Sequence, residues 1–75
     1  MTEELRMWTV YDHPRDCPFL YVARMFIVKD GTYEATANHI AMPHLDKLRM
    51  RLQEMGLVPL CRHPSDPPEV VETWI

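Results

Sequence analysis

The chain has 75 residues, of which 47% are hydrophobic and 25% are charged, and its formal net charge at pH 7 is -3. A chain of this length folds as a single domain (residues 1–75) around one small core, which leaves no room for a separate cofactor domain. The acidic balance lacks the dense basic footprint of nucleic-acid-binding proteins, so we expect the basic residues Lys47, Arg49 and Arg51 to form a solvated helix face.

The N-terminal half predicts three strands. Residues 1–6 are expected to fray, residues 7–11 form a short strand, and the prolines and aspartates of residues 12–18 form a rigid turn. Residues 19–29 give the strongest strand signal, because β-branched and aromatic side chains occupy both faces, as in a central strand. The dipeptide Asp30-Gly31 indicates a hairpin, and the alanine-rich residues 33–40 return as an edge strand.

One amphipathic helix is predicted over residues 43–55. Its apolar stripe has the three- and four-residue spacing of one helical face: Leu45, Leu48, Leu52 and Met55. Pro43 suits the first turn, where a backbone N–H is not needed. Gly56 suits the left-handed position after the last turn, and Leu57 can then pack back on the helix.

Two further strands complete the order β-β-β-α-β-β. Residues 57–62 contain Pro59 and predict an edge strand, and residues 70–75 alternate regularly up to the C-terminus. The expected fold is a small α+β domain, with a mainly antiparallel sheet and one amphipathic helix packed on one face. The opposite sheet face also carries apolar residues, so it must curl, be covered by loops or contact a partner.

A charged cluster lies where the first two strands meet their connecting turn. Its members are Tyr11, Asp12, His13, Arg15, Asp16 and Arg24. Arginine and aspartate can lock such a loop by bidentate pairing, and the same arginines can bind a carboxylate or phosphate of a partner or ligand. Histidine beside carboxylates can act as a general base. No carboxylate pair or Ser-His-Asp set has a recognisable context, so we assign no catalytic residue. The structural lock is the favoured interpretation, and the same cluster is the expected polar contact patch if the protein binds a partner.

Two loops share the pattern H-P-x-D-x-P, at residues 13–18 and 63–68. The pattern is typical of turns, because proline fixes φ and aspartate accepts from nearby backbone N–H groups. If the loops converge, they bring together a chemically sensible zinc set: His13, Cys17, Cys61 and His63. Their spacing differs from that of the usual zinc knuckle, so a small-ligand or metal site is only the alternative interpretation, and no metal or other cofactor is assigned.

The sequence also predicts a cytoplasmic protein. The acidic start lacks the basic and apolar regions of a signal peptide, and no apolar run approaches the length of a membrane span. Two cysteines in a reducing compartment are most often small buried side chains.

Three segments together resemble a family of short uncharacterised bacterial proteins. Residues 8–16 fit W-x-[IV]-Y-D-x-P-x-D, residues 21–24 fit [FY]-V-A-R, and residues 71–74 fit V-E-x-W. The resemblance implies a small cytoplasmic α+β domain and supplies no activity, cofactor, partner or catalytic residue. The family pattern has an aromatic residue where this chain has Cys17, which argues against a metal site there.

These observations favour a non-catalytic binding module over an enzyme. We expect it to bind a protein partner, or a second copy of itself as a homodimer, through the uncovered sheet face or an edge strand. The charged cluster would supply the polar contacts of that surface.

Overall fold

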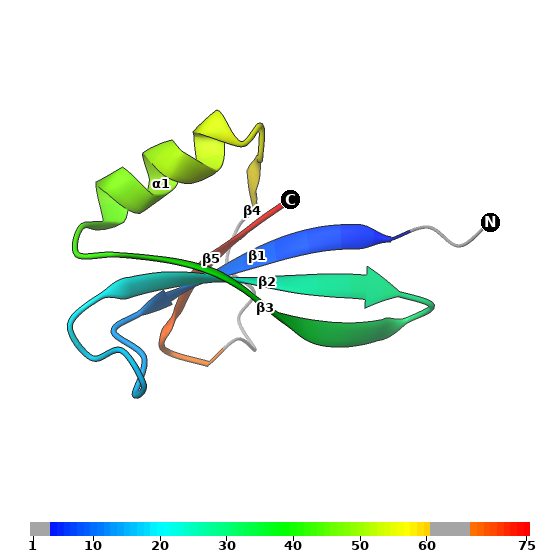
Figure 1. Ribbon diagram of the computed structural model, residues 1–75, viewed down its shortest axis with the longest axis horizontal. Helices are drawn as coiled ribbons and strands as arrows, with labels where there is room; N and C mark the ends of the chain where they lie inside the picture. The colour runs from blue at the N-terminus through cyan, green and yellow to red at the C-terminus, as the bar shows by residue number, and fades with distance from the viewer. Residues whose placement is uncertain (1–3, 61–66) are drawn as a thin grey trace.

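The computed structural model describes residues 4–60 and 67–75, which form one sheet and one helix (Figure 1). The elements are β1 (Leu5–Asp12), β2 (Tyr21–Lys29), β3 (Thr32–Met42), α1 (Leu45–Glu54), β4 (Pro59–Leu60) and β5 (Val70–Trp74). All neighbouring strands are antiparallel, in the order β3-β2-β1-β5-β4. The predicted α+β class and element order are therefore confirmed. No helix among the described residues is long and apolar enough to cross a membrane.

The strand bounds differ from the prediction mainly at the N-terminus. β1 begins at Leu5, because Leu5 and Arg6 pair with Val28 and Ile27 of β2, so these two residues do not fray. β3 is longer than predicted and lies at an edge, as expected. At the opposite edge, β4 is short, and the end of the predicted strand, residues 61–62, lies outside the described residues.

A two-residue turn joins β2 to β3. The backbone φ angle is 51° at Asp30 and 77° at Gly31, and the flanking residues Lys29 and Thr32 face each other in the ladder. Two positive φ angles are what a type I′ turn requires, and this turn matches the twist of the strands that it connects. The hairpin predicted from the sequence is therefore present.

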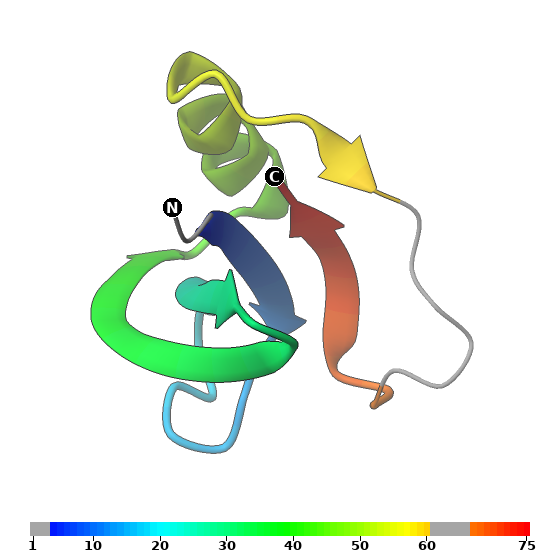
Figure 2. The ribbon, with the colours of Figure 1, turned by 90° about the vertical axis from the view of Figure 1, so that its right-hand side faces the viewer.

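An irregularity in β3 bends the sheet. The three residues Thr36–Asn38 face the single residue Met25 of β2, so β3 carries extra backbone at this point. The Thr36 Oγ1 donates to the Met25 carbonyl at 2.9 Å, and the Asn38 N–H donates to that Oγ1 at 3.2 Å. Figure 2 shows the consequence, since β3 curves around the end of the sheet.

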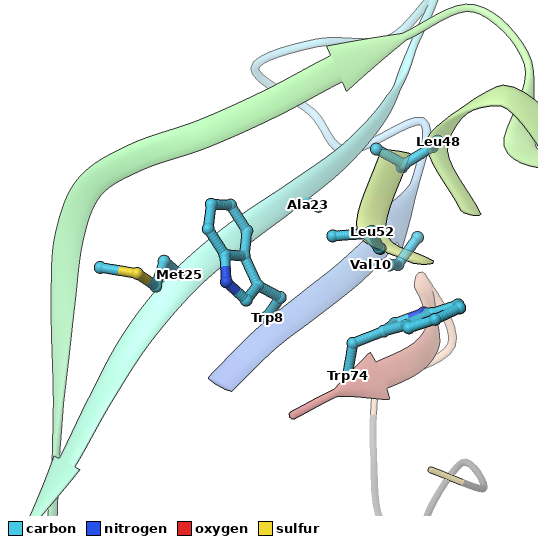
Figure 3. Packing of buried hydrophobic residues seen from close by; sticks show 7 residues of the cluster. All are labelled: Trp8, Val10, Ala23, Met25, Leu48, Leu52 and Trp74. Carbon is cyan, nitrogen blue, oxygen red and sulfur yellow. The ribbon is translucent and has the colours of Figure 1, made fainter. Parts of the chain in front are cut away.

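The core lies between α1 and one face of the sheet. Its buried members are Trp8, Val10, Ala23, Met25, Leu48, Leu52 and Trp74 (Figure 3). The stripe prediction is confirmed for Leu48 and Leu52, which are completely buried, and for Leu45, which packs against the core from its margin. It is wrong for Met55, whose exposed fraction is 39%.

The end of the helix explains why Met55 is exposed. Gly56 has a φ of 82°, its N–H donates to Gln53 O at 2.9 Å, and the Leu57 N–H donates to Leu52 O at 3.2 Å. These two bonds form a Schellman motif, which turns the chain so that Leu57 packs against the core instead of Met55. At the other end, Pro43 precedes the N-cap residue, so it lies just outside the first turn.

A polar contact joins the helix to β5 beside the core. The Glu72 carboxylate accepts from the Arg49 Nη2 at 2.6 Å and Nε at 3.1 Å, and from the Trp74 Nε1 at 2.5 Å. Arg51 pairs with Glu54 at 3.7 Å on the helix surface. Lys47, Arg49 and Arg51 are all exposed, so the predicted solvated helix face is confirmed, and two of the three residues form ion pairs there.

Candidate functional site

The loop between β1 and β2 consists of two successive turns. The Cys17 N–H donates to Pro14 O at 2.9 Å, and the Leu20 N–H donates to Cys17 O at 3.3 Å. The His13 N–H closes the loop by donating to Leu20 O at 3.1 Å. Pro18 is the second residue of the second turn, a position for which the fixed φ of proline is suited.

The interaction between Asp16 and Arg24 locks this loop to the sheet. Arg24 projects from the face of β2 that is opposite α1, and its guanidinium donates to the Asp16 carboxylate. The same guanidinium carbon lies 5.7 Å from the centre of the Tyr11 ring, within the range of a cation–π contact. The structural pairing expected for this arginine is therefore present.

The pairing of Asp16 with Arg24 makes the contribution of Asp16 to the stability of the fold depend on pH. The hydrogen bond from Arg24 holds the pKa of the Asp16 carboxyl below its ordinary value of 3.8. A carboxyl whose pKa is lower in the folded chain stabilises the fold above its unfolded pKa, and this contribution is lost as the pH falls through the folded pKa. An NMR titration of the Asp16 carboxyl carbon should show the lowered pKa, and Arg24→Gln should return it toward 3.8. Equal pKa values in the two proteins would contradict the lock.

Asp12 and His13 pair with each other at the start of the loop. The His13 Nδ1 hydrogen-bonds to the Asp12 carboxylate, and the imidazole ring lies 4.8 Å from the Tyr21 ring, centre to centre. His13 has a φ of 49°, in the left-handed region that histidine tolerates better than most residues. The pair holds the His13 ring at the start of the loop, directly after β1.

Five of the six residues of the predicted charged cluster line one open pocket of about 460 Å³, which we call the polar pocket. Its lining residues are Tyr11, His13, Pro14, Arg15, Asp16, Arg24 and Glu69. Asp12 is not among them, and its side chain is engaged with His13. Arg15 forms no ion pair with any residue in the described ranges, so its guanidinium is available in the pocket.

Sequence reasoning missed Glu69. The pairing of β1 with β5 brings this residue to the pocket, where the Asp12 N–H donates to Glu69 O at 2.7 Å. Glu69 follows two prolines and precedes the last strand, and nothing in that context marks it as part of a site. Only knowledge of the strand order could have revealed it.

The sheet face opposite α1, the far face, carries a continuous apolar surface. The antiparallel register aligns Leu5, Val28 and Tyr33 in one row across three strands, and Met7, Phe26 and Ala35 in the next. We call these six residues the apolar patch. The exposed fraction is 47% for Leu5 and 70% for Tyr33. The helix lies on the other face, and Figure 1 shows the β2–β3 hairpin extending beyond it.

The apolar patch adjoins the polar pocket. A shallow groove of about 220 Å³ is lined by Met7, Phe26 and Tyr33 of the patch, and by Thr9, Tyr11, Pro67 and Val70. Tyr11 also lines the polar pocket, so the two hollows share a wall. An extended ligand on the far face would therefore meet apolar side chains first and charged side chains next.

Other parts of the far face are covered, as the sequence suggested. Val22 is buried although it points away from the helix, and it lines a small hollow with Asp16 and Cys17 of the loop. Curling of β3 and the loop thus account for one end of this face. At the apolar patch, no described segment lies over the side chains of Leu5 and Tyr33 sufficiently to bury them.

The hypothetical zinc set is only partly within the described residues. Cys61 and His63 lie outside them, and Cys17 is a partly buried free thiol. Within residues 4–60 and 67–75, no three histidine, cysteine, aspartate or glutamate side chains are grouped so that they could hold a metal ion. The metal alternative therefore stays a prediction.

Comparisons of the chain with protein-family models, with curated proteins and with solved structures found no match. The resemblance to a bacterial family consequently stays a prediction.

Proposed function

We propose that the protein is a small non-catalytic binding module that holds a partner protein on the far face of its sheet. The observation that carries this proposal is the alignment of six apolar side chains in two adjacent rows, with Leu5 and Tyr33 substantially exposed. Contiguous exposed apolar surface is costly in water, and on folded proteins it commonly marks an interaction site. A domain of this size buries only a modest share of its apolar surface when it folds, and a partner on the far face would bury more of it.

The charged cluster forms the polar end of the proposed site. His13 and Arg15 offer hydrogen-bonding groups at the polar pocket, Tyr11 forms part of its lining, and the pairing of Arg24 with Asp16 holds its wall in place. Interfaces commonly combine an apolar centre with a polar rim, and arginine and tyrosine are enriched in them. As part of this proposal we place the protein in the cytoplasm, which is consistent with only two cysteines in the chain.

The pairing of charges supports binding rather than catalysis. The Asp12 carboxylate is engaged with His13, and the Asp16 carboxylate is engaged with Arg24. A general base needs to reach the proton that it removes. In this pocket the paired groups instead fix the shape of the loop.

A peptide-display selection against the folded protein tests the proposal. Peptides that bind the wild type should lose affinity by at least about tenfold for Tyr33→Glu, because a carboxylate in the apolar patch must be desolvated. Met50→Glu provides the matched control, since Met50 is an exposed apolar residue on α1. Failure to enrich any peptide, or equal binding to both variants, would overturn the proposal.

Light scattering distinguishes a partner protein from a second copy. The wild type should be monomeric at the concentrations of the selection. A dimer that Tyr33→Glu dissociates would overturn the proposal of a separate partner, because a second copy would then occupy the apolar patch.

The polar pocket supports a second candidate function, the binding of a small anionic ligand. The supporting observation is the Arg15 guanidinium, which lines an open pocket of about 460 Å³ without an ion pair to a described residue. Thermal-shift measurements with small carboxylates and phosphates should show stabilisation that Arg15→Gln removes. Arg51→Gln, on the helix surface, should leave the shift unchanged.

A further inference from the structure

We propose that the partner supplies an extended segment that pairs with the outer edge of β3 at Tyr33–Ala35 as an additional strand. This inference depends on the proposed function, because it specifies how the partner occupies the apolar patch.

The two edges of the sheet differ strongly. β3 has 11 residues and its outer side pairs with no described strand, whereas β4 has two residues, one of which is Pro59. Proteins commonly protect edge strands with proline, lysine or short length. Thr32–Met42 contains no proline, lysine or arginine and only one carboxylate, Glu34. The bulge at Thr36–Asn38 protects only the second half of the edge.

The geometry of the β2–β3 hairpin shows which backbone groups in the first half of β3 point away from β2. In a two-residue hairpin the flanking residues, Lys29 and Thr32, exchange hydrogen bonds. Because the pattern alternates, Glu34 also points its N–H and C=O toward β2, and Tyr33 and Ala35 point theirs outward. The Met25 carbonyl confirms the alternation from the other strand, since it faces β3 and accepts from Thr36 Oγ1 at 2.9 Å.

The side chains of the same two residues end the apolar rows. Tyr33 ends the row that begins at Leu5, and Ala35 ends the row that begins at Met7. A strand added at this edge would place its residues opposite Tyr33 and Ala35 on the far face, where apolar side chains would extend the two rows. Its intervening residue would lie beside Glu34 on the other face, where lysine or arginine would complement the carboxylate.

The charge of Glu34 argues against a second copy as the added strand. Antiparallel self-pairing that used the outward groups of both Tyr33 and Ala35 would place each residue opposite the other in the second copy. Glu34 would then lie directly opposite Glu34 of that copy, at the close spacing of a non-hydrogen-bonded pair. Like charges in this position are destabilising. The fitting occupant is therefore a different chain with an apolar–basic–apolar segment.

Hydrogen exchange on the amides of β3 tests the direction of the backbone groups. In the free protein, the Glu34 amide should exchange slowly and the Tyr33 and Ala35 amides quickly. Addition of a synthetic peptide with a Val-Lys-Val centre and polar flanks should slow exchange at Tyr33 and Ala35. Unchanged exchange at these two amides in a saturated complex would overturn the inference.

A proline variant tests strand addition separately from contact with the apolar patch. Ala35→Pro removes an outward N–H donor without removing a ladder bond to β2, so the fold should persist and affinity for the Val-Lys-Val peptide should fall by at least about tenfold. Glu34→Lys should shift preference from Val-Lys-Val toward Val-Glu-Val. If Tyr33→Glu abolishes binding while Ala35→Pro and the amide exchange are without effect, the proposed function holds and strand addition is wrong. If no peptide depends on Tyr33, both fail.

Discussion

Trp74→Ala should lower the free energy of unfolding by about 3–5 kcal/mol, the range typical of removing a large aromatic side chain from a core. Trp74 has an exposed fraction of 1% and is the largest of the fully buried side chains. A domain of this size is stabilised by roughly 4–11 kcal/mol in total. We therefore expect urea denaturation, followed by circular dichroism, to show a much lower midpoint or a chain that is already partly unfolded.

A second truncation provides the comparison for Trp74. Met50→Ala removes an exposed apolar side chain from the outer surface of α1, so its effect should remain within about 0.5 kcal/mol. A loss below about 1 kcal/mol for Trp74→Ala would mean that the core of Figure 3 does not hold the helix on the sheet.

Glu72→Ala should have the second-largest effect, a loss of about 2–3 kcal/mol. The Glu72 side chain has an exposed fraction of only 12%, and it accepts hydrogen bonds from both Arg49 and the largely buried Trp74 indole. Its removal leaves the indole N–H without an acceptor, and an unsatisfied buried donor costs more than the net value of its hydrogen bond. Urea denaturation would measure the change.

Two control variants show whether the loss of stability in Glu72→Ala comes from the hydrogen bonds of Glu72. Glu54→Ala removes a carboxylate from an exposed pair with Arg51, and exposed pairs of this kind contribute about 0–1 kcal/mol. Glu72→Gln keeps an acceptor for the indole and should recover part of the loss. If Glu72→Ala and Glu54→Ala had equal effects, the contact between helix and β5 would be no stronger than a surface pair.

Local signals made much of the fold predictable. The leucine spacing located the helix, Gly56 located its end, and Asp30-Gly31 located the hairpin. Each signal acts within a few residues, where backbone geometry and sequence spacing determine the result. The prediction that Met55 is buried was wrong because the chain reverses at Gly56 and brings Leu57 to the core in place of Met55.

Contacts between distant segments were not predictable in the same way. An alternating strand does not specify its neighbour, so the pairing of β1 with β5, and with it the place of Glu69 in the polar pocket, could not be predicted. The charged cluster was found because Arg24 interrupts an apolar strand and needs a partner. The apolar patch required the register, since only the register shows which side chains form rows across strands.

The two edges of the sheet, as far as the described strands define them, differ in a way that bears on growth by strand addition. Open-ended fibrils grow when each subunit has two complementary interfaces, so that every added subunit presents a new interface to the next one. In this sheet one edge is the long strand β3, and the other edge is β4, which has two residues, one of them a proline. A further copy of this chain therefore offers no edge of matching length to the outer side of β3, which disfavours growth of a fibre through contacts between β3 and β4.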